Sequence, residues 1–305
     1  MYAHCVSPLI TRGDFVVIEM DIKIQNHLET LKNIVPFEIS SVILHEGGDD
    51  FRVLEINGEW MFRFPRNEIS RKALQVEKGF LARFKAISPL PVPDHKYSGD
   101  DFVGYPKITG ALLDAEVFQS LSKKGLARIA RQMGQFLSAV HTFPVDKAKH
   151  LGVTEGWSGY HQQAMDCFRD EIAPRLSNSA LQKALTCMEG IMSEVFDSKV
   201  IHGDFALEDH VFFDEEKQQL CGVIDFADVT INDPAHDFQN IFEYGGETFF
   251  QNVMEHYQIK NDPTLLKRTK LRIEARPLFD TAYSLMFGFE KRFKDRMEYI
   301  EAKYG

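Results

Sequence analysis

The sequence predicts an α+β protein with two lobes: a small, β-rich amino-terminal lobe over residues 20–107 and a larger, mainly helical lobe over residues 108–305. Two patterns indicate this division, because short β-rich runs gather between residues 41 and 64, whereas apolar residues recur at helical spacing from Leu126 onward. A chain of 305 residues with 44% hydrophobic residues can also bury one large core or two moderate ones.

In the first lobe, the strand signals are local. Four runs are expected to form strands: residues 41–46, 51–56, 60–64 and 101–108. Asn57 and Gly58 stand between two of these runs, and this pair is a strong hairpin signal. Residues 70–86 carry apolar residues near helical spacing, and Ser70 could cap the start of that helix.

The second lobe is expected to be mainly helical. An apolar stripe over residues 126–140 predicts one amphipathic helix, and two further helices are expected at about 158–174 and 179–196. The run VFFDEEKQQLCGVIDF, residues 211–226, predicts a hairpin, and helices resume from about residue 236.

Charge and composition exclude several classes of function. A formal net charge of −10 disfavours binding to nucleic acid or to an anionic membrane, and it would attract a cationic small molecule. The four cysteines form no C-x-x-C pair, which fits a reducing compartment. No obligate protein partner is evident.

The amino terminus does not resemble a targeting segment. Arg12, Asp14 and Glu19 interrupt its apolar residues, and no apolar run reaches the about 20 residues that span a bilayer. We therefore expect a cytoplasmic protein without a membrane anchor. Met20 precedes a more ordinary start, so residues 1–19 are expected to form an extension outside the main fold.

The segment VIHGDFALEDH, residues 200–210, concentrates histidines and carboxylates. It is compatible with a polar turn, with a metal-dependent hydrolase that uses His202, Asp204, Asp209 and His210 as ligands, or with phosphoryl transfer. Phosphoryl transfer requires an acceptor-orienting carboxylate and separate Mg²⁺ ligands on an adjacent loop. VIDFADV supplies such a loop at the end of the predicted hairpin.

The order H-G-D, a metal ligand a few residues later, and then I-D-F-A resembles the aminoglycoside phosphotransferase family of kinase-like small-molecule phosphotransferases, most closely its 2″-phosphotransferase and macrolide-kinase branch. Over about residues 40–290, EWMFRFPR, VEKGFL, FVGYPKITG and INDPAHDF also resemble family segments in the same order. The resemblance implies a two-lobed protein-kinase-like fold. It further implies transfer of the γ-phosphate of ATP or GTP, with Mg²⁺, to a small-molecule hydroxyl, an aminoglycoside being the first candidate and a macrolide or another hydroxylated metabolite the alternative.

The resemblance assigns roles to five residues. Asp204 would be the catalytic aspartate, His202 would orient it, and Asp225 would chelate Mg²⁺. Arg63 stands where many family members have a phosphate-binding Lys, and Glu77 would be its ion-pair partner. Arg keeps the charge but changes the geometry of a phosphate contact, and a solvated surface pair is the alternative interpretation.

The nucleotide site would use backbone groups. By the same resemblance, those of Pro106 and Ile108 would meet the purine. Family members with a large aromatic residue at the position of Tyr105 often favour GTP, so the resemblance implies that GTP is used at least as well as ATP. The loop with Gly47 and Gly48 would cover the phosphates, although adjacent glycines also suit an ordinary hairpin turn.

The second metal ligand departs from the family pattern. The family places it five residues after the catalytic Asp, which is Asp209 here, whereas counting back along the hairpin from Asp225 selects His210. A loop absorbs an extra residue more easily than a hairpin shifts its register. We therefore predict that FALED is a lengthened loop and that His210 is the ligand, with Asp209 as the rival.

Other positions separate this chain from protein kinases and suggest a substrate site. Gly203 replaces the Arg of H-R-D, and the interval from Asp225 to Asp237 leaves no room for an activation segment, Asp237 being a structural residue. Glu243 and Glu247 lie four residues apart and share a face if the segment is helical. They could receive substrate ammonium groups or be simply solvated.

Overall fold

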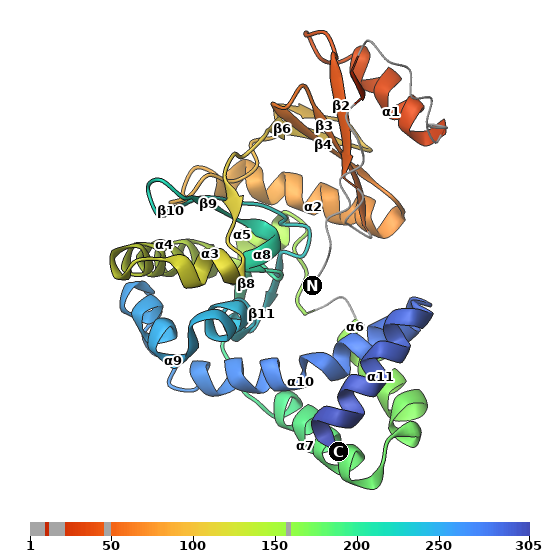
Figure 1. Ribbon diagram of the computed structural model, residues 1–305, viewed down its shortest axis with the longest axis vertical. Coiled ribbons are helices and arrows are strands. Elements are labelled where there is room, and N and C mark those ends of the chain that lie inside the picture. The colour runs from red at the N-terminus through yellow and green to blue at the C-terminus, as the bar shows by residue number, and fades with distance from the viewer. Residues whose placement is uncertain (1–9, 12–21, 46–49, 157–159) are drawn as a thin grey trace.

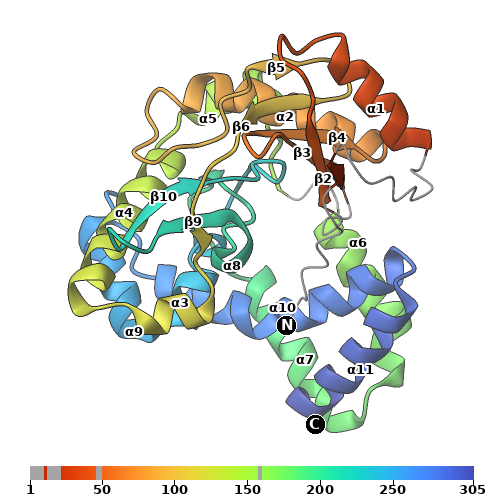
Figure 2. The same ribbon diagram turned by 45° about the horizontal axis from the view of Figure 1, so that its top comes forward.

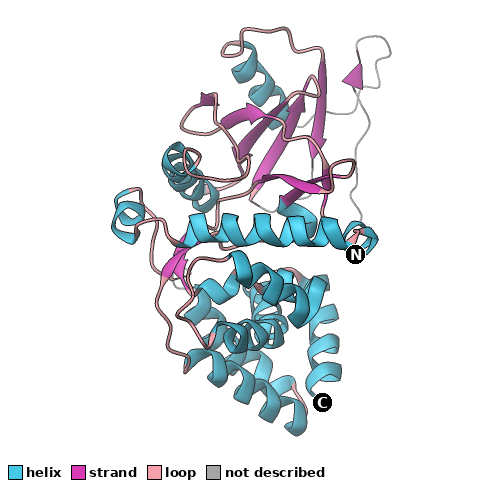
Figure 3. Cartoon of the chain, turned by 90° about the vertical axis from the view of Figure 1, so that its left-hand side faces the viewer, coloured by secondary structure: helices cyan, strands magenta, loops and turns pink. Residues whose placement is uncertain are grey.

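The computed structural model describes residues 10–11, 22–45, 50–156 and 160–305. Figure 1 shows a strand-rich lobe above a helical lobe, with helix α2 (Glu68–Phe84) at their boundary. Figure 3 shows most of the strands gathered on one side of the molecule. The predicted α+β, two-lobed architecture is confirmed.

An antiparallel sheet forms the amino-terminal lobe, with strands in the order β1-β2-β3-β4-β6-β5. The strands are β1 (Ile10–Thr11), β2 (Ser41–His45), β3 (Phe51–Ile56), β4 (Trp60–Pro65), β5 (Tyr97–Ser98) and β6 (Val103–Pro106). Asn57 and Gly58 have φ of 55° and 72° in the β3–β4 turn. Two positive φ angles are typical of the tight hairpin turn that Asn-Gly favours.

Residues 1–19 were expected to lie outside the main fold, but two of them join the edge of this sheet. Ile10 pairs with Val42 and Thr11 with Ser41, so these two residues add a short strand to the sheet. An edge strand offers unpaired backbone groups to any extended segment, and the sequence pattern of that segment need not reveal the pairing. Gly47 and Gly48 lie outside the described residues.

Helix α2 begins earlier than predicted. Asn67 is its N-cap: the Asn67 side chain accepts a hydrogen bond from the Ser70 N–H at 2.9 Å, and the Ser70 hydroxyl accepts from the Asn67 N–H at 3.2 Å. Ser70 is therefore the third helical residue of a capping box and not the cap. Buried Leu74, Glu77 and Leu81 recur at intervals of three and four residues, so α2 presents Glu77 on its packed face.

Helices dominate the second lobe, and α1 (Ile22–Lys32) packs on the sheet of the first. The second-lobe helices are α3 (Ala115–Ser120), α4 (Lys123–His141), α5 (Val145–His150), α6 (Tyr160–Cys167), α7 (Asn178–Met192), α8 (Leu207–His210), α9 (Gln239–His256), α10 (Leu265–Met286) and α11 (Glu290–Tyr304). After α6 the chain passes into a π-helical turn and then a 3₁₀ turn that contains Pro174, so the helix predicted over 158–174 is not regular.

Two small sheets position the acidic loops. One has the order β10-β9-β7, and the other pairs β8 with β11. Their strands are β7 (Ala111–Leu112), β8 (Lys199–Ile201), β9 (Val211–Asp214), β10 (Gln219–Val223) and β11 (Thr230–Asn232). Within FALED, Leu207 begins the single-turn helix α8, so the predicted loop is in part helical. Because β9 and β10 form one hairpin, the residues before and after it lie side by side.

The largest core cluster joins the lobes. Phe80 and Phe84 of α2 pack on Phe226, with ring centroids 5.9 and 5.7 Å apart, and Phe84 also contacts Phe136 of α4. A separate cluster lies among α6, α7, α10 and α11, which Figure 2 shows grouped together. Among the described helices, none has the length and apolar character needed to cross a bilayer.

Candidate active site

Strand β8 leads directly into the H-G-D motif, and His202 fixes its backbone. His202 is fully buried, its Nε2 bonds the Ile224 carbonyl at 3.1 Å, and its Nδ1 accepts from the Asp204 N–H at 3.3 Å. Both ring nitrogens are thus used, which orients Asp204 and removes His202 from any metal-ligand set. The hydrolase interpretation loses one of its four ligands for this reason.

Position 203 requires glycine because the backbone of Asp228 lies close to it. The φ of Gly203 is 89°, and a Cβ at this position would lie 2.1 Å from the carbonyl oxygen of Asp228. No side chain fits there, so the Arg of protein kinases could not occupy this position without moving the neighbouring loop.

Asp237 fixes the backbone of the H-G-D motif by hydrogen bonds. Its carboxylate accepts hydrogen bonds from the His202 N–H at 2.7 Å and the Gly203 N–H at 3.0 Å, and its Oδ2 is 3.0 Å from Nε2 of buried His141. Burial raises the pKa of Asp237, but the contact with His141 outweighs this and holds it below its ordinary value. Asp237 therefore ties down the loop as a carboxylate, which is the structural role predicted for it.

His210 lies between two carboxylates. Its Nδ1 is 2.9 Å from the backbone oxygen of Asp204 and therefore donates to it, so Nε2 carries the lone pair when the ring is neutral. Burial lowers the pKa of His210, but Asp204 and Asp225 outweigh this and raise it above its ordinary value. That Nε2 atom is 3.6 Å from Oδ2 of Asp225, and Nδ1 is 3.6 Å from Oδ2 of Asp204. Asp209 is exposed, whereas the His210 side chain is only 14% exposed. The single turn of α8 thus directs His210, and not Asp209, toward Asp225.

Arg63 links the two lobes. Its Nη1 donates to both oxygens of Glu77, at 2.8 and 2.9 Å, and its Nη2 donates to Oδ1 of Asp225 at 2.8 Å. The guanidinium also lies 4.1 Å from the centroid of the Phe51 ring. Arg63 and Glu77 are buried, so the alternative of a solvated surface pair is wrong.

Charge compensation keeps Asp225 ionised. Burial raises the pKa of Asp225, but Arg63, together with His210 and His202, brings it below its ordinary value. The φ of Asp225 is 64°, an uncommon conformation for a residue with a side chain. Oδ1 of Asp225 accepts the hydrogen bond from Arg63, and Oδ2 faces His210.

His95 is a site residue that the sequence did not indicate. Its Nε2 is buried, has no hydrogen-bond partner among the described residues, and lies 3.7 Å from Oε1 of Glu77. Burial, with the nearby charge of Arg63, lowers the pKa of His95 to about 4, so the ring is neutral. It stands on the chain between α2 and β6, where no motif or periodicity distinguishes it.

The predicted hinge lies at the end of β6. Tyr105 is buried near the end of β6, its ring 5.8 Å from that of His95. Pro106 ends β6 and is exposed, and Ile108 follows in the segment that leads to β7.

A hollow of about 650 Å³ opens beside Asp204. The residues that line it are Ala115, Phe118, Gln119, Asp204, Ala206, Glu208, Asp209, Asn240, Glu243, Tyr244, Arg276, Asp280 and Arg296. Glu243 is thus part of the lining, but both of its oxygens are bonded by Arg276.

Glu247 lies elsewhere. It is not among the lining residues, and it bonds Lys270 at 2.8 Å on the protein surface. The helical premise fails between Glu243 and Glu247, because Gly246 adopts φ 62° and ψ −165° and kinks α9. The sequence also did not indicate Arg276 and Arg296, which lie on distant helices.

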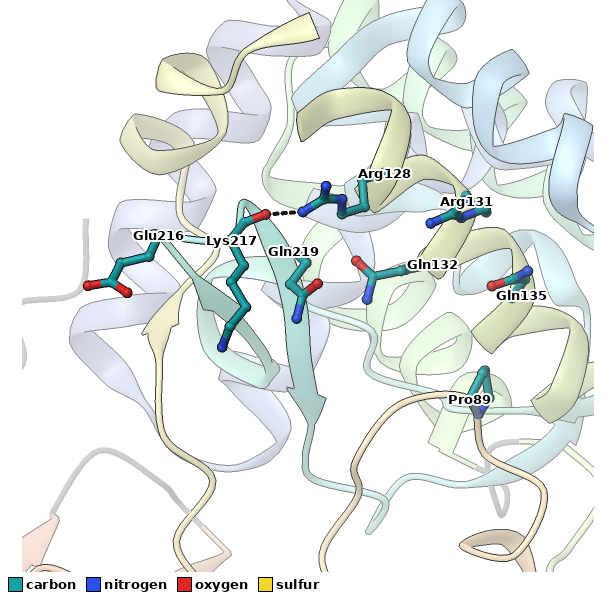
Figure 4. Close-up of a pocket in the computed structure, with 8 residues that line it drawn as sticks. All are labelled: Pro89, Arg128, Arg131, Gln132, Gln135, Glu216, Lys217 and Gln219. Carbon is teal, nitrogen blue, oxygen red and sulfur yellow. Dashed lines mark hydrogen bonds between the residues drawn. The ribbon is translucent and has the colours of Figure 1, made fainter. Parts of the chain in front are cut away.

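A second hollow, of about 770 Å³, lies between α4 and the tip of the β9–β10 hairpin (Figure 4). Figure 4 shows Arg128 donating to the Lys217 carbonyl. Gln132 both donates to and accepts from the backbone of Leu220. None of the predicted site residues lines it. Its contacts hold the hairpin against α4, which helps to place the loops before and after the hairpin.

No group of three or more His, Cys, Asp or Glu side chains within the described residues converges as a ready-made metal site. Oδ2 of Asp225 and Nε2 of His210 lie 3.6 Å apart and face one another.

The two lobes, the Arg63–Glu77 pair, the interlobe contact of Arg63 with Asp225, and the H-G-D and I-D-F loops define a kinase-like phosphotransferase of small molecules. A comparison with family models agrees: residues 41–270 match the phosphotransferase enzyme family. The chain belongs to this family, and the resemblance noted in the sequence is confirmed.

Individual relatives are distant. Viomycin phosphotransferase of Streptomyces vinaceus is 23% identical over 76% of this chain and 83% of its own length. The GDP complex of aminoglycoside 2′-phosphotransferase-IIIa superposes with a TM-score of 0.82 at 23% identity, covering 93% of this chain and 99% of that one. Macrolide 2′-phosphotransferase type I gives a TM-score of 0.73 at 20% identity, over 94% and 99% of the two chains.

Proposed function

We propose that this protein transfers the γ-phosphate of ATP or GTP to a hydroxyl of a small, amine-bearing molecule. One observation carries the proposal. Asp204 lines the hollow of about 650 Å³, which we call the acceptor hollow, and it also lies beside His210, which faces Asp225. A carboxylate at that junction can orient the acceptor hydroxyl and take its proton. Asp204 is the catalytic residue in this proposal.

The other residues position the donor. Asp225 and His210 would hold Mg²⁺, which when bound stabilises negative charge on the transferring phosphoryl group. Arg63 would bind phosphate oxygens through the N–H donors that its contacts with Glu77 and Asp225 leave on the guanidinium. The backbone of Pro106 and Ile108 would meet the purine.

A nucleotide-consumption screen of the purified protein tests the function. The acceptors are aminoglycosides first, then macrolides and other small hydroxylated amines, each with ATP and with GTP. Acceptor-dependent release of nucleoside diphosphate, together with a mass increase of one phosphate on the acceptor, supports the proposal. Diphosphate release that no acceptor stimulates would contradict it.

The metal ligand is tested by His210→Ala. We expect the Mg²⁺ concentration needed for half-maximal nucleotide binding to rise about tenfold or more, because one of two protein donors is lost. Calorimetric titration of nucleotide at a series of Mg²⁺ concentrations measures this directly, without turnover.

Asp209→Asn is the matched control for His210→Ala. It removes a charge one residue away but leaves the atoms that face Asp225 in place, so the Mg²⁺ requirement should change little. The opposite result, with a strong effect of Asp209→Asn and none of His210→Ala, would assign the ligand to Asp209.

Nucleotide choice is tested at the hinge. We expect GTP to bind at least as tightly as ATP, because Tyr105 is buried just before the proposed purine contacts and would restrict the space behind them. Competition between the two nucleotides measures the preference, and Tyr105→Leu should shift it toward ATP by widening that space. A strong ATP preference of the unmodified protein would refute the expectation.

A further inference from the structure

Two arginines lie in the wall of the acceptor hollow, and each is paired with a carboxylate. Arg276 of α10 bonds Glu243 of α9 through both of its terminal nitrogens, one contact being 2.9 Å. Arg296 of α11 is 3.1 Å from Asp280 of α10. The four side chains are between 28% and 40% exposed, so they are accessible from the hollow.

The part of the lining around α8 is different. Among the described residues, no Lys or Arg forms an ion pair with Glu208 or Asp209, and Glu208 accepts only a hydrogen bond from the Tyr244 hydroxyl at 2.9 Å. Asp204 adds a third carboxylate there. The negative charge of the hollow is therefore concentrated beside the catalytic aspartate.

These pairs change what the α9–α11 wall can bind. An ammonium group that approached Glu243 would meet the guanidinium of Arg276 at the same place, and repulsion would offset the attraction. To bind it, Glu243 would have to give up a two-point contact with Arg276. Likewise, Asp280 could bind an ammonium group only by giving up its contact with Arg296 of α11.

We propose that Arg276 and Arg296 determine acceptor specificity by excluding polycations, an inference that rests on the proposed phosphotransferase function. The acceptor that fits carries one ammonium centre close to its reacting hydroxyl, where Asp209 and Glu208 lie. Its remainder, which reaches α10 and α11, is neutral or zwitterionic. Polar or anionic groups there accept hydrogen bonds from the arginines' remaining N–H groups.

Kanamycin, a polycationic aminoglycoside, is the probe. We expect it to bind at least about tenfold more tightly to Arg276→Gln and to Arg296→Gln than to the unmodified protein, because each change frees a carboxylate and removes a repelling charge. Isothermal calorimetry in the presence of Mg²⁺ and a non-hydrolysable nucleotide measures the affinities. The ratio of kcat/KM for kanamycin to that for a monoamine alcohol should rise in the same variants.

Lys270→Gln is the matched control. It removes one positive charge from the same helix, but Lys270 pairs with Glu247 outside the hollow, so kanamycin affinity should stay unchanged. The two arginines are tested separately and are partly exposed, and thermal unfolding confirms that each variant is folded. Equal gains in all three variants would indicate a general charge effect and overturn the assignment.

The two proposals fail differently. If folded Arg276→Gln and Arg296→Gln bind kanamycin no more tightly than the unmodified protein, the specificity assignment is wrong, even if monoamine alcohols are phosphorylated. If kanamycin binding increases as expected but no acceptor stimulates nucleotide consumption, the charge assignment holds and the phosphotransferase function is contradicted.

Discussion

Asp204→Asn lowers turnover by roughly 10³-fold or more and leaves nucleotide affinity within about twofold of the unmodified protein. An amide cannot take the acceptor proton, whereas the contacts that we propose for Arg63, Asp225 and the hinge with the nucleotide are left unchanged. Side-chain size is nearly unchanged, and the backbone bond from Asp204 to His202 is preserved. Steady-state kinetics with a saturating acceptor and calorimetric nucleotide titration measure the two quantities.

Asp209→Asn again provides the comparison for this prediction. It makes the same chemical change in the same hollow, and we expect it to raise the acceptor KM while kcat stays within a few-fold of the original value. Equal losses of turnover in both variants, or a parallel loss of nucleotide affinity in Asp204→Asn, would contradict the catalytic role of Asp204.

Asp237→Ala destabilises the fold by about 3–5 kcal/mol, because it strands three buried polar groups. The His202 and Gly203 N–H groups and Nε2 of His141 all lose their carboxylate partner at a fully buried position. Denaturant unfolding followed by circular dichroism measures the change. Exposed Glu247→Ala is the control and should stay within about 0.5 kcal/mol.

The same substitution has a defined pH dependence. Because the pKa of Asp237 is lower in the folded protein, its stabilising contribution is present above the ordinary Asp pKa of about 3.9 and is lost as the pH falls through the folded value. The difference in unfolding free energy between the unmodified protein and Asp237→Ala should therefore be constant near neutral pH and shrink in acid. A difference that grows toward low pH would show that Asp237 is not an ionised acceptor.

Local patterns were sufficient for most secondary structure. The β3–β4 hairpin was predicted because Asn57-Gly58 restricts the turn directly, and the helix that contains Glu77 was predicted because its buried positions recur at helical spacing. Errors arose where a local signal had a close rival. Ser70 and Asn67 are both good caps, and only the completed capping box selects Asn67.

By itself, the sequence determined the family, the order of the elements and the residue types of the phosphate and acid chemistry, because these depend on residues close together along the chain. Only the tertiary structure decided how distant charges pair. Arg63 meets Asp225 across 162 residues, and the Arg276 that lines the acceptor hollow is already bonded to Glu243. Such pairs depend on how helices and lobes pack, and the spacing of two residues along the chain does not reveal whether their side chains meet. The charge that remains available to a substrate is therefore known only from the folded chain.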